Sequence, residues 1–153
     1  MPPTIRPARP DEYDAIARLW MNSWASTGLE QPSTSLLAKL RARISIEIGK
    51  GWSLFVADDD GTIAAMLALH LPAFHLDMLF VAPEYQGQNL GRRLLAFTRE
   101  QLPNEIVLRC VRENEKAWRW YEREGFLFEM EALEPLIGFV MKYYRWKKPE
   151  TIQ

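Results

Sequence analysis

At 153 residues, with 48% hydrophobic and 25% charged residues, the chain has the length and composition of one globular domain, which we place at residues 1–153. Its net charge of -1 excludes the basic surface that a nucleic-acid-binding protein needs, so we expect no nucleic-acid partner. No apolar run approaches the ~20 residues that cross a bilayer, and no secretory signal is visible. A single cysteine makes neither a disulfide framework nor a metal site. We therefore expect a cytoplasmic protein without membrane or metal partners.

The first half of the chain is predicted to contain a short strand, two helices and three further strands. Apolar residues recur at helical spacing in the two helical segments, and glycines follow the second one. Asp-Asp-Asp-Gly at 58–61 joins two β-like runs and is typical of a hairpin. The predicted elements are a strand at 4–7, helices at 13–24 and 36–48, and strands at 52–58, 62–70 and 75–81.

The second half alternates helices and strands and ends in a pair of strands. A helix that begins at Leu90 stops before Pro103, and Gly125 ends the next helix. The order β-α-α-β-β-β-α-β-α-β-β describes an α+β, three-layer fold in which four helices cover a single mixed, mostly antiparallel sheet of seven strands. The predicted elements of this half are helices at 90–102 and 114–124 and strands at 105–111, 126–134 and 139–146.

A polar loop, Gln86-Gly87-Gln88-Asn89-Leu90-Gly91, lies between an apolar strand and an amphipathic helix. Its small residues and asparagine let successive backbone N–H groups turn toward one point at a helix N-terminus, where the partial positive charge favours an anion. Arg92 and Arg93 follow in the first turn, where the helix dipole alone disfavours cations. The loop therefore predicts a site for a phosphate or pyrophosphate; the alternative is a tight strand-to-helix turn without a ligand.

The loop and its flanks resemble the pyrophosphate-binding signature of the GNAT superfamily of N-acetyltransferases. That signature is Gln or Arg, two residues, Gly, one residue, and Gly or Ala, after a strand that ends Val-x-Pro-x-Tyr. Residues 79–86 match the strand and its end, and residues 91–95 match the following helix. Asn89 stands where the family usually has the first glycine; because asparagine tolerates a positive φ better than other non-glycine residues, we expect the loop to form.

A second segment resembles the same family. Residues 114–126, Asn-Glu-Lys-Ala-Trp-Arg-Trp-Tyr-Glu-Arg-Glu-Gly-Phe, are similar to its Asn-x-x-Ala-x-x-x-Tyr-Glu-x-x-Gly-Phe. In the family the asparagine contacts the pantetheine arm and the tyrosine lies beside the thioester, which implies these roles for Asn114 and Tyr121. The alternatives are a helix N-cap for Asn114 and a core aromatic for Tyr121, which shares a helix face with Ala117.

The resemblance covers roughly the whole chain and implies an acetyl-CoA-dependent N-acetyltransferase, an acyltransferase with acetyl-CoA as cosubstrate and no metal. The alternative is a non-catalytic acyl-CoA-binding regulatory module. Asn89 and Arg109 point toward that alternative, because Arg109 stands where some members carry a carboxylate. The cofactor-binding residues that the resemblance implies are Leu79, Phe80, Val81, Gln86, Gly87, Gln88, Asn89, Leu90, Gly91, Arg92, Asn114, Ala117 and Tyr121.

Acetyl transfer to an amine needs a base, an acid and a group that stabilises the oxyanion. Tyr121, a phenol, is expected to act as the general acid toward the departing thiolate. His75 and Asp77 alternate along one strand and therefore share a face, similar to the His-x-His of arylalkylamine N-acetyltransferases; we expect His75, directly or through water, to be the base and Asp77 to support it. A backbone N–H of Phe80 or a neighbour is expected to stabilise the oxyanion. The alternative is that His75 is a turn residue and Asp77 only binds a cationic substrate.

The acceptor is expected to be a primary amine of a small molecule or peptide, which the sequence does not identify. Four aromatic side chains either form a pocket for it or belong to the core: Trp20, Trp24, Trp52 and Phe74. The aromatic-rich final strands are compatible with a homodimer. The residues expected to contact the acceptor are Trp24, Phe74, His75 and Asp77.

Overall fold

The computed structural model describes residues 2–28 and 31–150, and within them the chain forms seven strands and four α-helices. The predicted α+β fold and the predicted element order are confirmed, and each boundary lies within two residues of its predicted place. Three short 3-10 helices, at Pro10–Glu12, Leu71–Ala73 and Pro83–Tyr85, were not predicted. The elements are β1 (Thr4–Pro7), α1 (Tyr13–Ala25), α2 (Thr34–Gly49), β2 (Trp52–Asp59), β3 (Thr62–His70), β4 (His75–Val81), α3 (Leu90–Gln101), β5 (Glu105–Val111), α4 (Glu115–Arg123), β6 (Leu127–Glu134) and β7 (Phe139–Lys147).

The strands form one sheet in the order β1-β2-β3-β4-β5-β7-β6. Every neighbouring pair is antiparallel except β4 and β5, which are parallel and are connected through α3. The predicted mixed, mostly antiparallel sheet is therefore confirmed. Because parallel strands need a crossover, the helix that follows β4 must return over one face of the sheet before β5 begins.

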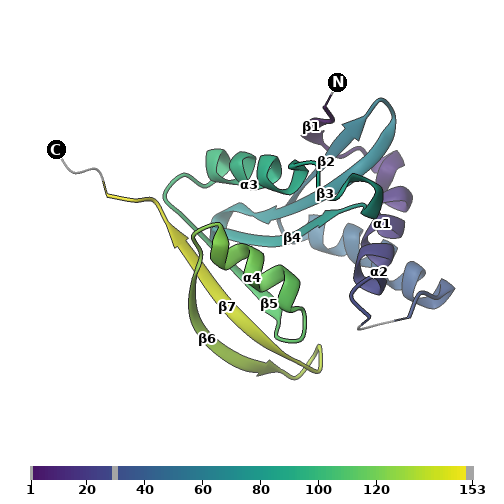
Figure 1. Cartoon of the computed structure of the whole chain (residues 1–153). Helices are drawn as coiled ribbons and strands as arrows, with labels where there is room; N and C mark the ends of the chain where they lie inside the picture. Colours follow the sequence, from purple (N-terminus) through teal and green to yellow (C-terminus); the bar gives the residue numbers. More distant parts are fainter. Residues whose placement is uncertain (1, 29–30, 151–153) are drawn as a thin grey trace.

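Two helices cover each face of the sheet, which gives three layers (Figure 1). On one face α2 buries Leu36, Leu40 and Ile44, which recur four residues apart, and α1 packs beside it against β2 and β3. On the other face α3 and α4 contribute Leu94 and Tyr121 to a core with β3, β5 and β7. The helical spacing of apolar residues thus decides which side of each helix meets the sheet.

The parallel pair of β4 and β5 parts almost at once. Its single register pair in the described part of the chain joins His75 to Val107, and the Val107 N–H donates to the Phe74 carbonyl at 2.8 Å. Beyond this junction the two strands diverge, and Figure 1 shows β6 and β7 turning away from β2, β3 and β4 as a separate wing. We call the opening between β4 and β5 the fork.

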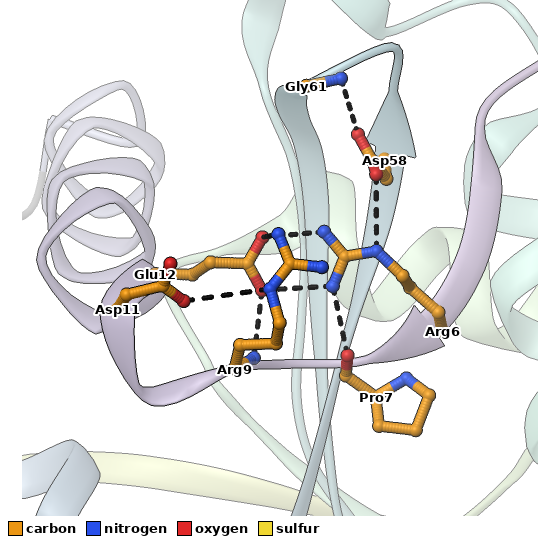
Figure 2. Close-up of polar contacts among 7 residues, drawn as sticks. All are labelled: Arg6, Pro7, Arg9, Asp11, Glu12, Asp58 and Gly61. Atoms are coloured by element: carbon orange, nitrogen blue, oxygen red, sulfur yellow. Dashed lines mark hydrogen bonds and ion pairs between the residues drawn. The ribbon is translucent and has the colours of Figure 1, made fainter.

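A charge network fixes the N-terminal strand to the sheet (Figure 2). The Arg6 guanidinium donates to both carboxylate oxygens of Glu12, at 2.9 and 2.6 Å, and its Nε donates to Asp58 at 3.1 Å. The Glu12 carboxylate also accepts from the Arg9 backbone N–H at 2.8 Å. The hydrogen bond from Arg6 lowers the pKa of Glu12 to about 2, against the opposing effect of burial. The network thereby joins β1, the segment before α1 and the end of β2.

Glu12→Gln is expected to destabilise the protein at neutral pH by about 1–2 kcal/mol, because an amide cannot compensate the charge of Arg6. Since the pKa of folded Glu12, about 2, lies below its ordinary value of 4.5, the carboxylate stabilises the fold above pH 4.5 and loses this effect as the pH falls toward 2. Urea unfolding at neutral pH and at about pH 3 checks this, and the difference between wild type and variant should shrink at the lower pH.

Asp14→Asn is the matched control for that measurement. Asp14 also pairs with an arginine, Arg41, at 2.7 Å, but its side chain is 87% exposed. An exposed pair contributes little to stability, so this variant should unfold like the wild type at both pH values. A Glu12 variant that lost the same stability at both pH values would contradict the assigned pKa.

Candidate functional site

The polar loop that the sequence predicts to bind an anion has a suitable backbone. Gly87 (φ 81°) and Asn89 (φ 68°) lie in the left-handed region, and α3 begins at Leu90, so Asn89 adopts the positive φ expected of it. In the part of the chain that the structure describes, no backbone N–H from Gly87 to Arg92 donates to a protein acceptor. The first helical bond runs from the Arg93 N–H to the Asn89 carbonyl at 3.1 Å. Such unpaired donors at a helix N-terminus are suited to a phosphate.

Two glutamine side chains of the loop form hydrogen bonds that stabilise its conformation. Gln86 Nε2 donates to the Val81 carbonyl at 3.1 Å, and Gln88 Nε2 donates to the Glu84 carbonyl at 3.3 Å. Both bonds return to the segment that leads from β4 into the loop. The side chains are thereby occupied in shaping the turn, while its backbone donors remain available to a ligand.

The two arginines after the loop have different partners. Arg92 Nε pairs with Glu124 Oε1 at the end of α4, at 3.1 Å, and the Arg92 side chain remains 64% exposed. Arg93 turns away and donates to the Pro3 carbonyl at 2.7 Å. Arg92 therefore stays at the surface beside the loop, where it can meet an anion, whereas Arg93 holds the N-terminal end of the chain.

Two further contacts position the loop, and the sequence does not reveal either of them. The Tyr85 hydroxyl donates to Asp59 Oδ2 at 2.5 Å, which raises the pKa of Tyr85 and ties the loop to the end of β2. At Gly91, an added Cβ would lie 3.4 Å from the ring of Trp120, so α3 and α4 are in van der Waals contact at this point. Both partners lie more than 20 residues away in the chain, and only the arrangement of the elements brings them together.

The backbone of β4 presents polar groups to the fork. The Ala82 N–H donates to the Ala64 carbonyl at 2.9 Å, which marks a hydrogen-bonded pair of the β3–β4 ladder. Because such pairs alternate along an antiparallel ladder, Phe80 is also directed to β3, while the N–H and C=O groups of Leu79 and Val81 face the fork. The backbone groups that can meet a ligand there thus belong to the neighbours of Phe80 and not to Phe80 itself.

Asn114 and Ala117 begin the second predicted segment, which follows β5. The Asn114 carbonyl accepts the first helical bonds of α4, from Ala117 at 3.1 Å and from Trp118 at 3.3 Å. Its side chain makes no cap hydrogen bond. Asn114 therefore holds the N-cap position through its backbone, and this role does not occupy the side-chain amide.

Tyr121 lies in the core beneath α4, with only 7% of its surface exposed. Its ring makes edge contacts with Trp120 and Phe126, at centroid distances of 4.9 and 5.4 Å. Burial, reinforced by the nearby Cys110 thiol, raises the pKa of Tyr121 well above its ordinary value, so the hydroxyl stays protonated. The ring therefore packs in the core, and its protonated hydroxyl has no hydrogen-bond partner among the described residues.

His75 and Asp77 meet at the closed end of the fork. His75 Nδ1 contacts Asp77 Oδ1, and the Trp52 indole N–H donates to Asp77 Oδ2. Burial alone would raise the pKa of Asp77, but His75 and Trp52 together bring it below its ordinary value, so the carboxylate is charged. With Nδ1 turned toward this carboxylate, Nε2 is the ring nitrogen left for a substrate proton.

The aromatic residues considered for an acceptor pocket divide into two groups. Trp20 and Trp52 are buried in the core, with ring centroids 6.0 Å apart. Phe74 is 47% exposed and lies directly before the junction of β4 and β5. Trp24 of α1 makes an edge contact with Phe139 of β7, at 6.1 Å, and so connects the two sides of the fork. Trp24 and Phe74 therefore remain candidates for contact with a substrate.

Known proteins share this sequence pattern. Residues 13–126 match the model of a family described as the Acetyltransferase (GNAT) family. The probable N-acetyltransferase Rv2775 of Mycobacterium tuberculosis is 29% identical over 153 residues, which cover 88% of this chain and 86% of that protein. The peptidyl-lysine N-acetyltransferase YjaB of Salmonella typhimurium is 27% identical over 124 residues, which cover 80% of this chain and 81% of that protein.

Solved structures share the fold. Apo YjaB from Escherichia coli, solved in solution, has a TM-score of 0.78 at 20% identity, over 97% of this chain and 100% of that chain. The PaiA N-acetyltransferase from Thermoplasma acidophilum, in complex with coenzyme A, has a TM-score of 0.72 at 20% identity, over 96% of this chain and 99% of that chain. In residues 2–28 and 31–150, no helix is long and apolar enough to cross a membrane, and no cluster of His, Cys, Asp or Glu is placed to hold a metal ion.

Proposed function

Because the chain belongs to the GNAT family of acetyltransferases, whose model matches residues 13–126, we propose that it moves an acetyl group from acetyl-CoA to a primary amine by direct attack. One observation carries the proposal: the row of unpaired N–H groups from Gly87 to Arg92, at the N-terminus of the helix that follows β4. A diphosphate satisfies several such donors at once and is favoured by the helix dipole.

Acetyl-CoA suits the rest of the site as well. The pantetheine arm, laid in the fork, would bond to the free backbone N–H groups of Leu79 and Val81 and to the Leu79 carbonyl, and would take the place that β5 leaves when it diverges. The unbonded side-chain amide of Asn114 suits an amide of the same arm. Support also comes from the PaiA structure, a similar fold in complex with coenzyme A.

We assign the steps of transfer to three groups. His75 Nε2, directly or through a water, takes a proton from the ammonium group, and the neutral amine nitrogen then attacks the thioester carbonyl. The carbonyl electron pair moves to oxygen, where a β4 backbone N–H that faces the fork stabilises it. The C–S bond then breaks, and the Tyr121 hydroxyl gives its proton to the CoA thiolate. Solvent takes the second proton of the attacking nitrogen, returns a proton to Tyr121 and removes the one on His75, so the products are the acetylated amine and CoA.

The acceptor that we propose is an amine on a flexible chain, with a lysine side chain of a peptide as the first candidate. The relative named a peptidyl-lysine N-acetyltransferase supports it, since that protein and this chain are 27% identical over 124 residues. The charged carboxylate of Asp77 and the exposed ring of Phe74, at the closed end of the fork, suit an approaching ammonium group and its methylene chain.

The alternative is a non-catalytic acyl-CoA-binding regulatory module. Arg109, which stands where some members of the family carry a carboxylate, pairs with Glu134 at 3.1 Å and cannot accept a proton. The contact between His75 and Asp77 favours the enzyme, because it supplies a base at another place in the same fork.

A thiol-release assay with acetyl-CoA separates the two functions. The panel contains a lysine peptide with a blocked N-terminus, the same peptide with arginine in place of lysine, and several small primary amines. We expect that, of the compounds in the panel, only the lysine peptide causes release of CoA. The mass of this peptide should increase by one acetyl group. Calorimetric binding of CoA without release for any amine would favour the regulatory module, and no binding would overturn both.

The affinity for CoA is expected to depend on the backbone conformation of Asn89. Asn89→Ala should weaken CoA binding about fivefold to tenfold, because an alanine at positive φ costs about 1 kcal/mol or more. Asn89→Gly should bind CoA within about threefold of the wild type, because glycine adopts the same φ without strain. Calorimetry with CoA checks both variants. An equal loss of CoA affinity in both variants would show that the ligand needs the asparagine side chain and not the backbone conformation.

We also propose that two copies associate through β6, the free edge of the sheet beyond β7. Its carboxylates do not oppose this, because Glu129, Glu131 and Glu134 each pair with an arginine of the same chain. An exposed edge strand without uncompensated charge is a template for a second strand. Sedimentation equilibrium should show a dimer that Leu133→Lys dissociates, and a wild type that stays monomeric would exclude it. The large exposed apolar side chains of β6 are Leu127, Phe128, Met130 and Leu133.

A further inference from the structure

We infer that Trp52 is a positioning residue of the transfer site: through the Asp77 carboxylate it fixes the ring of His75, so that Nε2 faces the acceptor. The inference rests on the proposed role of His75 as the base. It goes beyond that role because Trp52 is a buried core residue, far from the two sequence signatures, with no motif of its own.

The register of three strands places the residues in one row. Trp52 lies opposite His70 across β2 and β3, and His70 lies opposite His75 across β3 and β4. Directly opposite residues of an antiparallel ladder point to the same face. Asp77 joins this row as the bulged residue of β4, for which β3 provides no partner. Asp77 lies on the same side as His75, and its carboxylate contacts both His75 and Trp52.

Both oxygens of the Asp77 carboxylate are engaged. Oδ1 contacts His75 Nδ1, and Oδ2 accepts from the Trp52 indole N–H. A carboxylate held at both oxygens cannot rotate, so Oδ1 stays in front of His75. His75 Nδ1 is buried and forms no hydrogen bond of regular geometry with the described residues, so the adjoining Asp77 carboxylate is the acceptor that favours the proton on Nδ1 and the lone pair on Nε2. By holding the Asp77 carboxylate, Trp52 therefore favours the Nδ1–H tautomer of His75, which is the tautomer that a general base needs.

The indole that makes this bond has little freedom to move. Trp52 exposes 6% of its surface and belongs to the core between the sheet and the helices α1 and α2. The other ionisable group that acts on Asp77 is His70, which also lowers the pKa of the Asp77 carboxyl. His70 is itself closely packed, since a Cβ at Gly51 would lie 3.0 Å from its Nε2.

Trp52→Phe tests the inference, because phenylalanine keeps an aromatic ring in the core but removes the N–H donor. The ¹⁵N shifts of the His75 ring, measured without any substrate, should show the Nδ1–H tautomer in the wild type and a mixture of tautomers in the variant. The kcat should fall about tenfold, while the KM for acetyl-CoA stays unchanged, since the variant alters only the base. Trp20→Phe is the matched control: it removes a neighbouring core indole that has no hydrogen-bond partner among the described residues, and should leave both the tautomer and kcat unchanged.

The two variants together can overturn the inference in two ways. A Trp52→Phe variant with the wild-type tautomer and kcat overturns the inference, as does a Trp20→Phe variant with the same losses, since the effect would then come from the core. His75→Ala without loss of rate would overturn the proposed base, yet the tautomer would still report whether Trp52 orients the ring. If Trp52→Phe does not fold, the indole N–H proton signal of the wild-type protein replaces it. That signal should move upfield in Asp77→Asn; an unmoved signal would contradict the hydrogen bond.

Discussion

His75→Ala is expected to lower kcat about a hundredfold at neutral pH, because a positioned general base contributes at least that factor and no other group at the closed end of the fork is assigned to replace it. The amine of a lysine side chain is almost fully protonated at that pH, so the reaction depends on a group that removes the proton. The Asp77 carboxylate would remain, but its low pKa makes it a poor base. Steady-state rates at saturating acetyl-CoA and saturating amine measure the loss.

The pH dependence of the His75→Ala rate distinguishes the loss of a base from damage to the fold. As the pH rises toward the amine pKa of about 10.4, more of the amine is neutral without help, so the gap between wild type and variant should narrow. CoA affinity should be unchanged, since His75 lies at the closed end of the fork, away from the loop that binds the nucleotide. A rate within about twofold of the wild type at neutral pH would remove His75 from the mechanism.

The elements and the anion loop could be predicted because their signals are local. In α2 the spacing of Leu36, Leu40 and Ile44 already determines which side of the helix is buried. Asn89 could be assigned a positive φ from the intrinsic tolerance of asparagine, and it has one, 68°. His75 and Asp77 could be placed on one face, and they are in contact. These predictions need only the period of a helix or strand and the stereochemistry of one residue.

The contacts across the sheet could not be predicted, because they depend on strand order and register. Alternation along β4 separates Phe80 from Leu79 and Val81, but it does not say which set faces β3 and which faces the fork. The bonds of Asp77 to Trp52 and of Tyr85 to Asp59 span 25 and 26 residues. The bond of Asp77 lies beside an irregularity in the pairing of β3 and β4, which the alternation along β4 does not predict.

Tyr121→Phe is expected to lower kcat about a hundredfold while CoA binding stays near the wild-type value, because the change removes a proton donor and leaves the ring in its place. The reason lies in the burial of the phenol. Burial raises its pKa well above the ordinary value, so the hydroxyl carries its proton before the reaction; because the same shift makes it a weaker acid, the thiolate must form directly against it. The nearby Cys110 is no substitute, since burial raises the pKa of its thiol to about 12 and it serves as part of the core.

Tyr144→Phe is the matched control for this variant, because it removes a second tyrosine hydroxyl from the same core. The Tyr144 hydroxyl donates to Glu122 at 2.7 Å, so its loss should cost about 1 kcal/mol of stability without an effect on kcat. If both variants lost the same activity, the effect would come from the packing of α4 against the sheet. If neither lost activity, the thiolate would have to leave with a proton from water or with none. A large loss confined to Tyr121→Phe is the result that makes its hydroxyl the acid.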